Sequence, residues 1–216
     1  MIILSNTGGV ARTNCFLVAD EATSKAALFD APDHTITPLL EEASRRKLDL
    51  EALWLTHGHF DHFADHAKAR EKFPNLKVFI HRLDEAKAKS PERQTRIFGV
   101  PMEIPPLHAD GYVEDRQKLK VGALEMEVIH TPGHSSGHVG YYFPAEHILI
   151  GGDLIIGGSV GRTDLPDSNH ADLEKSIRRV MQLPPDTRLL GGHGPETTLK
   201  DERAKNWFVR EALGLN

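Results

Sequence analysis

The sequence predicts an α/β fold in which two β-sheets pack face to face with helices on the outside. Apolar runs of strand length alternate with segments of helical spacing along the 216 residues. Both halves of the chain run through strands and then a helix, which suits this layered architecture. Candidate metal ligands lie on both sides of a proline-rich middle segment, so that segment is a poor domain boundary. We therefore expect residues 1–216 to form one domain.

The first half of the chain carries four predicted strands and two predicted helices. The polar turn "EATS" separates the first two strands, and the third strand is a mostly apolar run that suits a buried position. The first helix has Pro38 in its first turn and Asp33 or Thr35 as its N-cap. The predicted strands are Asn14–Asp20, Lys25–Asp30, Leu50–Thr56 and Lys77–His81, and the predicted helices are Thr35–Leu48 and residues 64–73.

The second half follows a segment without periodicity. Lys89–Gly111 contains "PMEIPPLHADG", whose prolines predict a long surface loop. Strands then resume and are followed by a helix, one more strand and a last helix. The predicted strands are Leu124–His130, His138–Phe143, His147–Gly152 and residues 187–192, and the predicted helices are Ala171–Leu183 and residues 201–214.

Composition excludes several classes of protein. The formal net charge of −5 and the absence of a basic stripe argue against a nucleic-acid partner. No apolar run approaches the roughly 20 residues that a membrane span needs, and the start of the chain lacks the features of a signal peptide. Cys15 is the one cysteine, so no intramolecular disulfide is expected, and its apolar strand predicts a core position. We expect a soluble cytoplasmic protein.

Histidine is unusually abundant, with 13 residues, and four ligating side chains stand together in "THGHFDH". His57 and His59 are two apart at the end of a predicted strand, where side chains two residues apart point the same way. They can therefore hold one metal ion together. Asp61 and His62 follow as the chain turns into a helix, and can reach a second position beside the first. Imidazole nitrogen and carboxylate oxygen are ligands that zinc accepts in catalytic sites.

Three later segments share one pattern, in which a predicted strand is followed by a histidine or an aspartate among glycines. "HTPGHSSGH" places His134, "ILIGGDLI" places Asp153 and "RLLGGHGPE" places His193 after such strands. Each residue alone is most often a polar loop residue or a helix cap. Four segments with the same pattern predict a metal site assembled at the ends of strands.

These motifs resemble the metallo-β-lactamase superfamily, because "THGHFDH", "TPGHSSGH", "GGDLI" and "GGHGPET" stand in that family's order. The resemblance implies an αββα sandwich of two mixed β-sheets flanked by helices, with two divalent metal ions. It implies zinc, with iron or manganese as alternatives, and a metal-bridging hydroxide as the nucleophile. Asp61 would also orient that hydroxide. The resemblance assigns His57, His59 and His134 to the first metal, Asp61, His62 and His193 to the second, and Asp153 as the bridge between them.

Within the superfamily the chain looks like the glyoxalase II (hydroxyacylglutathione hydrolase) group. The resemblance implies hydrolysis of a small thioester such as S-lactoylglutathione, with Arg162 of "VGRTDLP" at the place of a lysine that contacts the glutathione carboxylate. The competing interpretation is that Arg162 pairs with Asp164 and shapes the loop. Two departures concern glutathione: the chain ends about one helix after His193, without the added C-terminal domain, and Gly194-Pro195 replaces the usual Glu-Tyr.

Other functions remain open at this stage. A persulfide dioxygenase would use a single iron held by His57, His134 and Asp153. A lactonase or another ester hydrolase of the superfamily, and a non-catalytic metal-binding module, are further alternatives. Antibiotic hydrolysis is not expected, because β-lactamases of the superfamily usually carry a zinc-binding cysteine near the position of Asp153.

Several polar residues outside the predicted ligand set have either two alternative interpretations or an expected surface position. Asp30 either hydrogen-bonds the site or simply ends a strand. His130 and His138 flank a ligand loop and are candidate hydrogen-bond partners of ligands. His66 is expected on a helix surface, and the position of His34 is left open. The others, His81, His108, His147 and His170, are expected in loops or on the surface.

Overall fold

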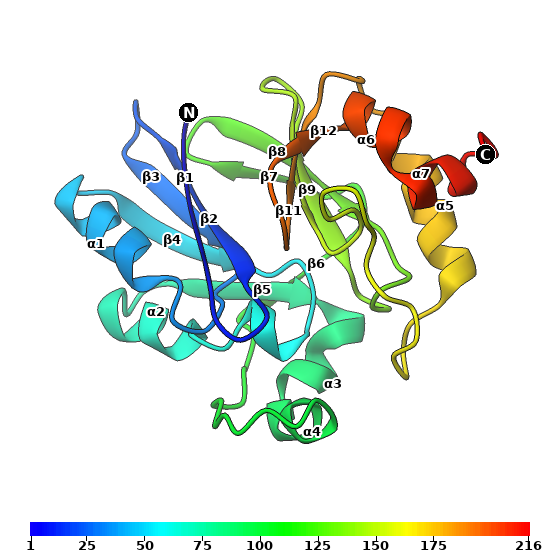
Figure 1. The fold of residues 1–216 in the computed structure, drawn as a ribbon. Coiled ribbons are helices and arrows are strands. Elements are labelled where there is room, and N and C mark those ends of the chain that lie inside the picture. The colour runs from blue at the N-terminus through cyan, green and yellow to red at the C-terminus, as the bar shows by residue number, and fades with distance from the viewer. The chain divides into compact units, whose positions relative to one another are not determined.

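The computed structural model describes residues 1–216, which form two compact units. The first unit contains residues 1–113 and 120–124, and the second contains residues 114–119 and 125–216. One mixed β-sheet with helices packed against it forms the body of each unit (Figure 1). No helix combines the length and the hydropathy needed to cross a membrane.

The sheet of the first unit has the order β1-β2-β3-β4-β5-β6. Strands β1, β2 and β3 pair antiparallel, because short turns connect them, whereas β3 to β6 pair parallel. All eight residues of β2 are buried, as expected for a strand inside the sheet. The strands are β1 (Ile2–Gly8), β2 (Thr13–Asp20), β3 (Lys25–Phe29), β4 (Asp49–Trp54), β5 (Lys77–His81) and β6 (Gly111–Val113).

Helices α1 (Thr37–Arg45) and α2 (His66–Lys72) pack on the first sheet (Figure 1). Leu39 and Leu40 of α1 share a buried cluster with Leu17, Leu28 and Leu53 of the strands, so this helix closes an apolar core. The short helices α3 (Glu85–Ala88) and α4 (Pro91–Ile97) follow β5, and the 3₁₀ turns η1 (Phe60–His62) and η2 (Arg82–Asp84) lie in the same unit.

The sheet of the second unit has the order β12-β11-β10-β9-β8-β7. Strand β10 pairs parallel with β11, and β9 pairs antiparallel with both β8 and β10. Strands β9 and β10 are buried along their full length, so Asp153, which follows β10 directly, leaves a rigid part of the sheet. The strands are β7 (Lys118–Val121), β8 (Leu124–His130), β9 (Val139–Phe143), β10 (Ile148–Gly152), β11 (Arg188–Gly191) and β12 (Thr197–Thr198).

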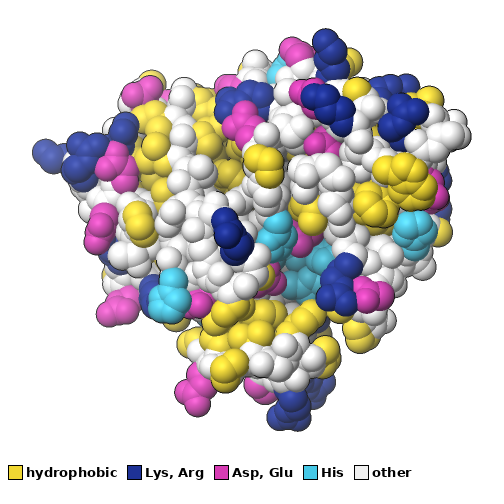
Figure 2. Space-filling view, viewed as in Figure 1, with side chains coloured by type: hydrophobic (Ala, Val, Ile, Leu, Met, Phe, Trp, Pro, Cys, Tyr) yellow, Lys and Arg dark blue, Asp and Glu magenta, His cyan; other side chains and the backbone are white.

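Three helices pack on the second sheet: α5 (His170–Val180), α6 (Leu199–Lys205) and α7 (Trp207–Ala212). Leu173 and Ile177 of α5 and Val209 of α7 share a buried cluster with Leu149 and Leu189 of the strands. Helix α7 exposes Trp207 and Phe208, and Figure 2 shows hydrophobic side chains gathered over this helix at the right of the view.

Most predicted strands and helices are confirmed, and two predictions of local structure are wrong. The loop predicted for "PMEIPPLHADG" is confirmed, because residues 101–110 contain no helix or strand. Helix α4, in the segment before this loop, was not predicted, and Pro91 occupies its first turn, where proline is favoured. The last predicted helix is two helices. Asn206 breaks it by taking an extended conformation and accepting hydrogen bonds from the N–H groups of Phe208 and Val209. Neither Asp33 nor Thr35 caps α1, whose N-cap Ile36 lacks a side-chain hydrogen bond. Strands β1, β6, β7 and β12 were not predicted.

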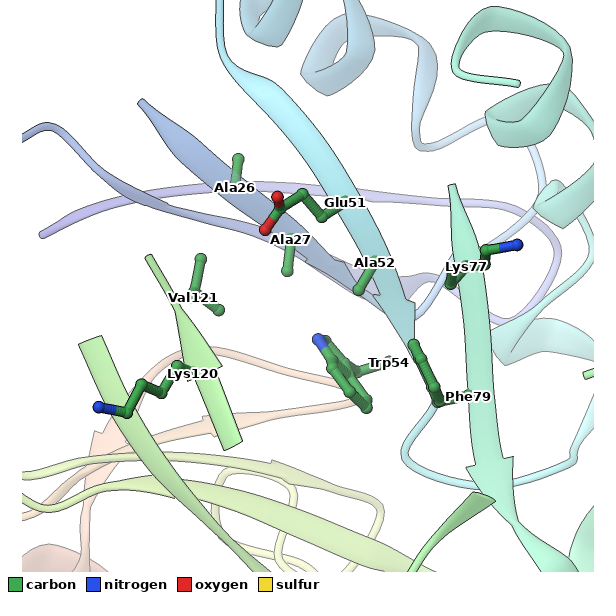
Figure 3. A pocket seen from close by; sticks show the side chains of 9 residues that line it. All are labelled: Ala26, Ala27, Glu51, Ala52, Trp54, Lys77, Phe79, Lys120 and Val121. Atoms are coloured by element: carbon green, nitrogen blue, oxygen red, sulfur yellow. The ribbon is translucent and has the colours of Figure 1, made fainter. Parts of the chain in front are cut away.

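A cavity of about 210 Å³ lies on the first unit, lined by residues of β3, β4 and β5 and by Lys120 and Val121 of the segment 120–124 of the same unit (Figure 3). Trp54 and Phe79 stack along its wall with ring centroids 4.2 Å apart, and three alanines leave room beside them. None of the lining residues is a predicted metal ligand. The cavity is therefore separate from the candidate metal ligands.

Candidate metal centre

The loop after β4 gathers the four ligand candidates of the first unit. His57 Nε2 lies 3.0 Å from His59 Nδ1, and the two rings are edge to face. The rings of His57 and His62 have centroids 4.1 Å apart, and His62 Nε2 lies 3.5 Å from Asp61 Oδ2. Two ligand atoms on one tetrahedral ion lie roughly 3.3 Å apart. The spacing of His57 with His59, and of Asp61 with His62, therefore fits ligand atoms that share an ion.

Asp30 orients two of these histidines from the end of β3. Its carboxylate accepts hydrogen bonds from the N–H of Thr56, from Thr56 Oγ1 and from His62 Nδ1, each at 2.8 Å. Thr56 Oγ1 donates to Asp30, so it accepts from His57 Nδ1 at 3.0 Å. Both histidines therefore carry their proton on Nδ1 and present the lone pair of Nε2, which is the state that a metal ligand needs. The buried environment of Asp30 makes this arrangement rigid.

Asp61 is held by Thr13 at the start of β2. Thr13 Oγ1 donates to Asp61 Oδ2 at 2.7 Å, and the Asp61 side chain stays partly exposed. One carboxylate oxygen is thus fixed by the protein, and the group keeps access to solvent. The arrangement suits a residue that orients a water molecule.

The second unit gathers the other three ligand candidates around Asp153. Asp153 Oδ2 lies 3.5 Å from His134 Nε2 and 3.2 Å from His193 Nε2. These distances again fit ligand atoms that share an ion. His134 and Asp153 are buried, and the side chain of His193 is about one-fifth exposed. Asp153 is the carboxylate that both histidines approach.

Backbone groups orient the ligands of the second unit. His134 Nδ1 donates to the carbonyl of Arg162 at 2.9 Å, which leaves Nε2 as the ligand atom. This contact needs a close approach of the loop, and a Cβ at Gly161 would stand 2.1 Å from the Asp153 carbonyl oxygen. His138 Nδ1 donates to Thr131 Oγ1, and its Nε2 accepts the Asp153 N–H at 2.9 Å.

The structure resolves several roles that the sequence left open. Asp30 bonds the site rather than only ending a strand, and His138 holds the main chain of a ligand candidate. His130 Nε2 instead contacts the carbonyl of Ser136. The surface position expected for His66 is wrong: the ring is buried, Nδ1 donates to the Phe63 carbonyl, and burial lowers its pKa. Cys15 is fully buried in the core, as predicted, and burial raises its pKa.

Arg162 forms a two-pronged ion pair with Asp164. Its Nε and terminal nitrogen lie 2.6 Å from the two carboxylate oxygens, and both side chains are more than half exposed. The hydrogen bonds to Asp164 raise the pKa of Arg162 further above its usual value. This geometry is the one expected for a loop-shaping pair, and the exposed guanidinium also remains within reach of an anionic ligand. The substrate-binding role of Arg162 stays a prediction.

A comparison with protein families decides the relationship that the motifs indicate. The model of the metallo-beta-lactamase superfamily matches residues 8–193. The chain belongs to the metallo-beta-lactamase superfamily. Its probable metallo-hydrolase relative YqgX of Bacillus subtilis is 33% identical over 90% of each chain. Hydroxyacylglutathione hydrolase GloC of Haemophilus influenzae is 30% identical over 91% of this chain and 92% of its own length.

Solved structures of the superfamily share the whole fold. The structure of the BLEG-1 B3 metallo-beta-lactamase matches with a TM-score of 0.88 at 31% identity, covering 96% of this chain and 99% of that one. TTHA1623 in a di-iron-bound form matches with a TM-score of 0.83 at 35% identity, covering 96% and 100%. The prediction of the metallo-β-lactamase fold, with two mixed sheets flanked by helices, is confirmed. As a member of this superfamily, the chain also carries clusters of histidine and aspartate that could hold metal ions.

Proposed function

We propose that the protein is a dinuclear metal-dependent hydrolase that cleaves a small thioester, with a hydroxyacylglutathione as the expected type of substrate. The observation that carries the proposal is the double orientation by Asp30, which prepares both His57 and His62 as ligands. The 30% identity to a protein named hydroxyacylglutathione hydrolase supports the choice of substrate. In this proposal the seven ligands are His57, His59, Asp61, His62, His134, Asp153 and His193.

The two ligand sets are proposed to share two divalent ions, and this sharing would make residues 1–216 one catalytic domain. His57, His59 and His134 would hold one ion, Asp61, His62 and His193 the other, and Asp153 both. When bound, two such ions lower the pKa of water toward neutrality and polarise a carbonyl group. We propose zinc as the native metal, with iron as the leading alternative because TTHA1623 binds two irons.

The side chains of the protein would supply orientation and proton control. Asp61, held by Thr13, would accept a hydrogen bond from the attacking water and align it with the thioester carbonyl. Addition of water to the carbonyl carbon breaks the carbon–sulfur bond and releases a hydroxy acid and a thiol. Arg162 would bind an anionic end of the substrate by exchanging its contact with Asp164. The cytoplasm is the proposed place of action, because the thiol product stays reduced there.

Two other activities merit direct comparison. A β-lactamase is one, because a structure described as a B3 metallo-beta-lactamase is 31% identical to the chain. A single-iron persulfide dioxygenase is the other, and its set of His57, His134 and Asp153 would leave His62 without a role. The buried pair between His62 and Asp30 argues for a ligand at this position and so for two ions.

One panel separates these activities. The purified protein, loaded in turn with zinc, iron or manganese, is tested with S-lactoylglutathione, a simple acyl thioester, a lactone and a chromogenic β-lactam. Oxygen consumption is measured with glutathione persulfide, and metal content is determined on the same samples. Thioester turnover above all other activities, with two metals per chain, is the expected result. Oxygen uptake with one iron per chain, or β-lactam turnover above thioester turnover, would contradict the proposal.

A further inference from the structure

The peptide groups that flank His59 are held by a side chain from another part of the first unit. Gln94 of α4 donates from Nε2 to the carbonyl of Gly58 at 2.9 Å and accepts at Oε1 from the N–H of Phe60 at 3.0 Å. These are the last peptide group before His59 and the first one after it. One buried amide therefore bridges the main chain on both sides of a ligand candidate.

The bridge fixes the backbone conformation of His59. This residue has φ −77° and ψ 142°, which is extended, and its Nδ1 lies 3.0 Å from His57 Nε2. The loop has no strand partner here to impose that conformation. Gln94 takes the place of a neighbouring strand, because its side-chain amide offers a donor, Nε2, and an acceptor, Oε1, to the main chain on either side of His59. Its Nε2 also donates to the carbonyl of Lys87 at 3.2 Å, which anchors the amide and fixes which end faces which peptide group.

A second buried side chain holds the same loop. Asp84 Oδ2 accepts the N–H of Gly58 at 2.8 Å, and Lys87 Nζ lies 3.0 Å from Asp84 Oδ1. The approach is so close that a Cβ at Gly58 would stand 2.7 Å from the Asp84 carbonyl oxygen. Both backbone polar groups of Gly58 are thus held, the N–H by Asp84 and the carbonyl by Gln94. The Gln94 amide spans His59, because it bonds both the Gly58 carbonyl and the Phe60 N–H.

We propose that Gln94 is a positioning residue for the metal centre, which sets metal affinity by holding His59 in its ligand conformation. This inference rests on the proposed function, because it requires His57 and His59 to bind an ion. A ligand that is free to rotate loses conformational entropy when the ion binds, and the bridge removes part of that loss in advance. Loss of the bridge should therefore weaken metal binding more than it weakens the fold.

Two variants test the proposal, with a control on the same helix. Gln94→Leu removes both bonds, and Gln94→Glu keeps the shape and the acceptor for Phe60 but sets an oxygen against the carbonyl of Gly58. Thr95→Val is the matched control, because Thr95 is buried on α4 and its hydroxyl bonds only the Glu92 carbonyl within the helix. Zinc affinity is measured by competition with a chromophoric chelator, ligand geometry by the visible spectrum of the cobalt-loaded protein, and stability by urea unfolding without metal.

Both Gln94 variants should bind zinc about 10- to 100-fold more weakly than the wild type, with an altered cobalt spectrum. Thr95→Val should leave zinc affinity and spectrum unchanged. Gln94→Glu decides the question if Gln94→Leu fails to fold. Zinc affinity within twofold of the wild type and an unchanged cobalt spectrum in a folded Gln94 variant would overturn the inference. If instead His59→Ala leaves zinc binding by the wild-type protein intact, the proposed metal site itself is wrong.

Discussion

The substitution Asp30→Asn tests how ligand orientation is built. The buried carboxylate accepts three hydrogen bonds at 2.8 Å, two from Thr56 and one from His62. Asparagine keeps the size and suits the left-handed backbone of this position, where φ is 60°. It offers one accepting oxygen and one donating nitrogen in place of two oxygens. At least one of the donors that now face Asp30 must therefore lose its acceptor or reverse its role.

The contacts of Asp30 predict two separate effects of its replacement, one on the free energy of unfolding and one on metal affinity. A hydrogen bond to a charged group contributes about 1.5–3 kcal/mol, so losing one should lower the free energy of unfolding by about that amount. Asp30→Ala removes all three bonds and should cost about 3–5 kcal/mol, because buried donors are then unpaired. With an amide nitrogen facing it, His62 Nδ1 must accept, and its proton moves to Nε2. That proton blocks the ligand atom, so metal affinity should fall about 10- to 100-fold.

Urea unfolding of the metal-free variants measures the first effect, and competition with a chelator measures the second. Asp20→Asn is the matched control, because Asp20 is also a buried carboxylate with three hydrogen bonds, to Ala22, Thr23 and Ala123, at the opposite end of β2 from Thr13. The control should lose stability and keep its metal affinity. If Asp30→Asn loses stability while binding metal as tightly as the wild type, the orientation argument is refuted.

Four further predictions follow from the site. His193→Ala should reduce the metal content from two ions per chain to one, as measured by elemental analysis of metal-replete protein; an unchanged content together with unchanged activity would contradict the ligand role. Asp153→Ala should lower turnover more than replacement of any single histidine, because its charge offsets the repulsion between two ions; near-normal kcat would exclude a bridging role. Arg162→Ala should raise KM for anionic thioesters with little change for neutral ones, whereas equal losses on both, with lower stability, would assign Arg162 to the loop pair with Asp164. His66→Gln should alter how the free energy of unfolding depends on pH, because burial lowers the pKa of His66 in the folded state. The contribution of neutral His66 to that free energy is fully present above the unfolded-state pKa of about 6.5, and it is lost as the pH falls through the lowered folded-state pKa. The unfolding free energy of wild type relative to the variant should therefore decrease on acidification, and a difference independent of pH between 5 and 8 would show that His66 does not titrate this way.

The sequence was sufficient to predict strands that flank the ligand candidates. Val139–Phe143 and Ile148–Gly152 are apolar runs next to glycines, and both are fully buried strands in the structure. The edge strands were harder to predict. Ile2–Gly8 mixes half-buried and exposed side chains, and Lys118–Val121 is mostly charged or exposed, so neither has the apolar pattern of a central strand. Helix α4 was not predicted, because the prolines of this segment indicate a loop. Proline breaks a helix in its interior, but Pro91 stands in the first turn of α4, where it is tolerated.

The ligand candidates could be predicted because each lies within a short motif, whereas the groups that orient them could be predicted only in part: Asp30 and His138 were named as candidates, and Gln94 was not. Asp30 is 32 residues from His62, Gln94 is 34 from Phe60, and the Arg162 carbonyl is 28 from His134. A loop that aims side chains at a metal cannot also run in a regular helix or strand, so its peptide groups need partners from elsewhere. Those partners include the side-chain amide of Gln94 and the backbone carbonyl of Arg162, and no local sequence motif predicts either contact. Their identification depends on tertiary structure, and their replacement should alter metal binding while every ligand remains in place.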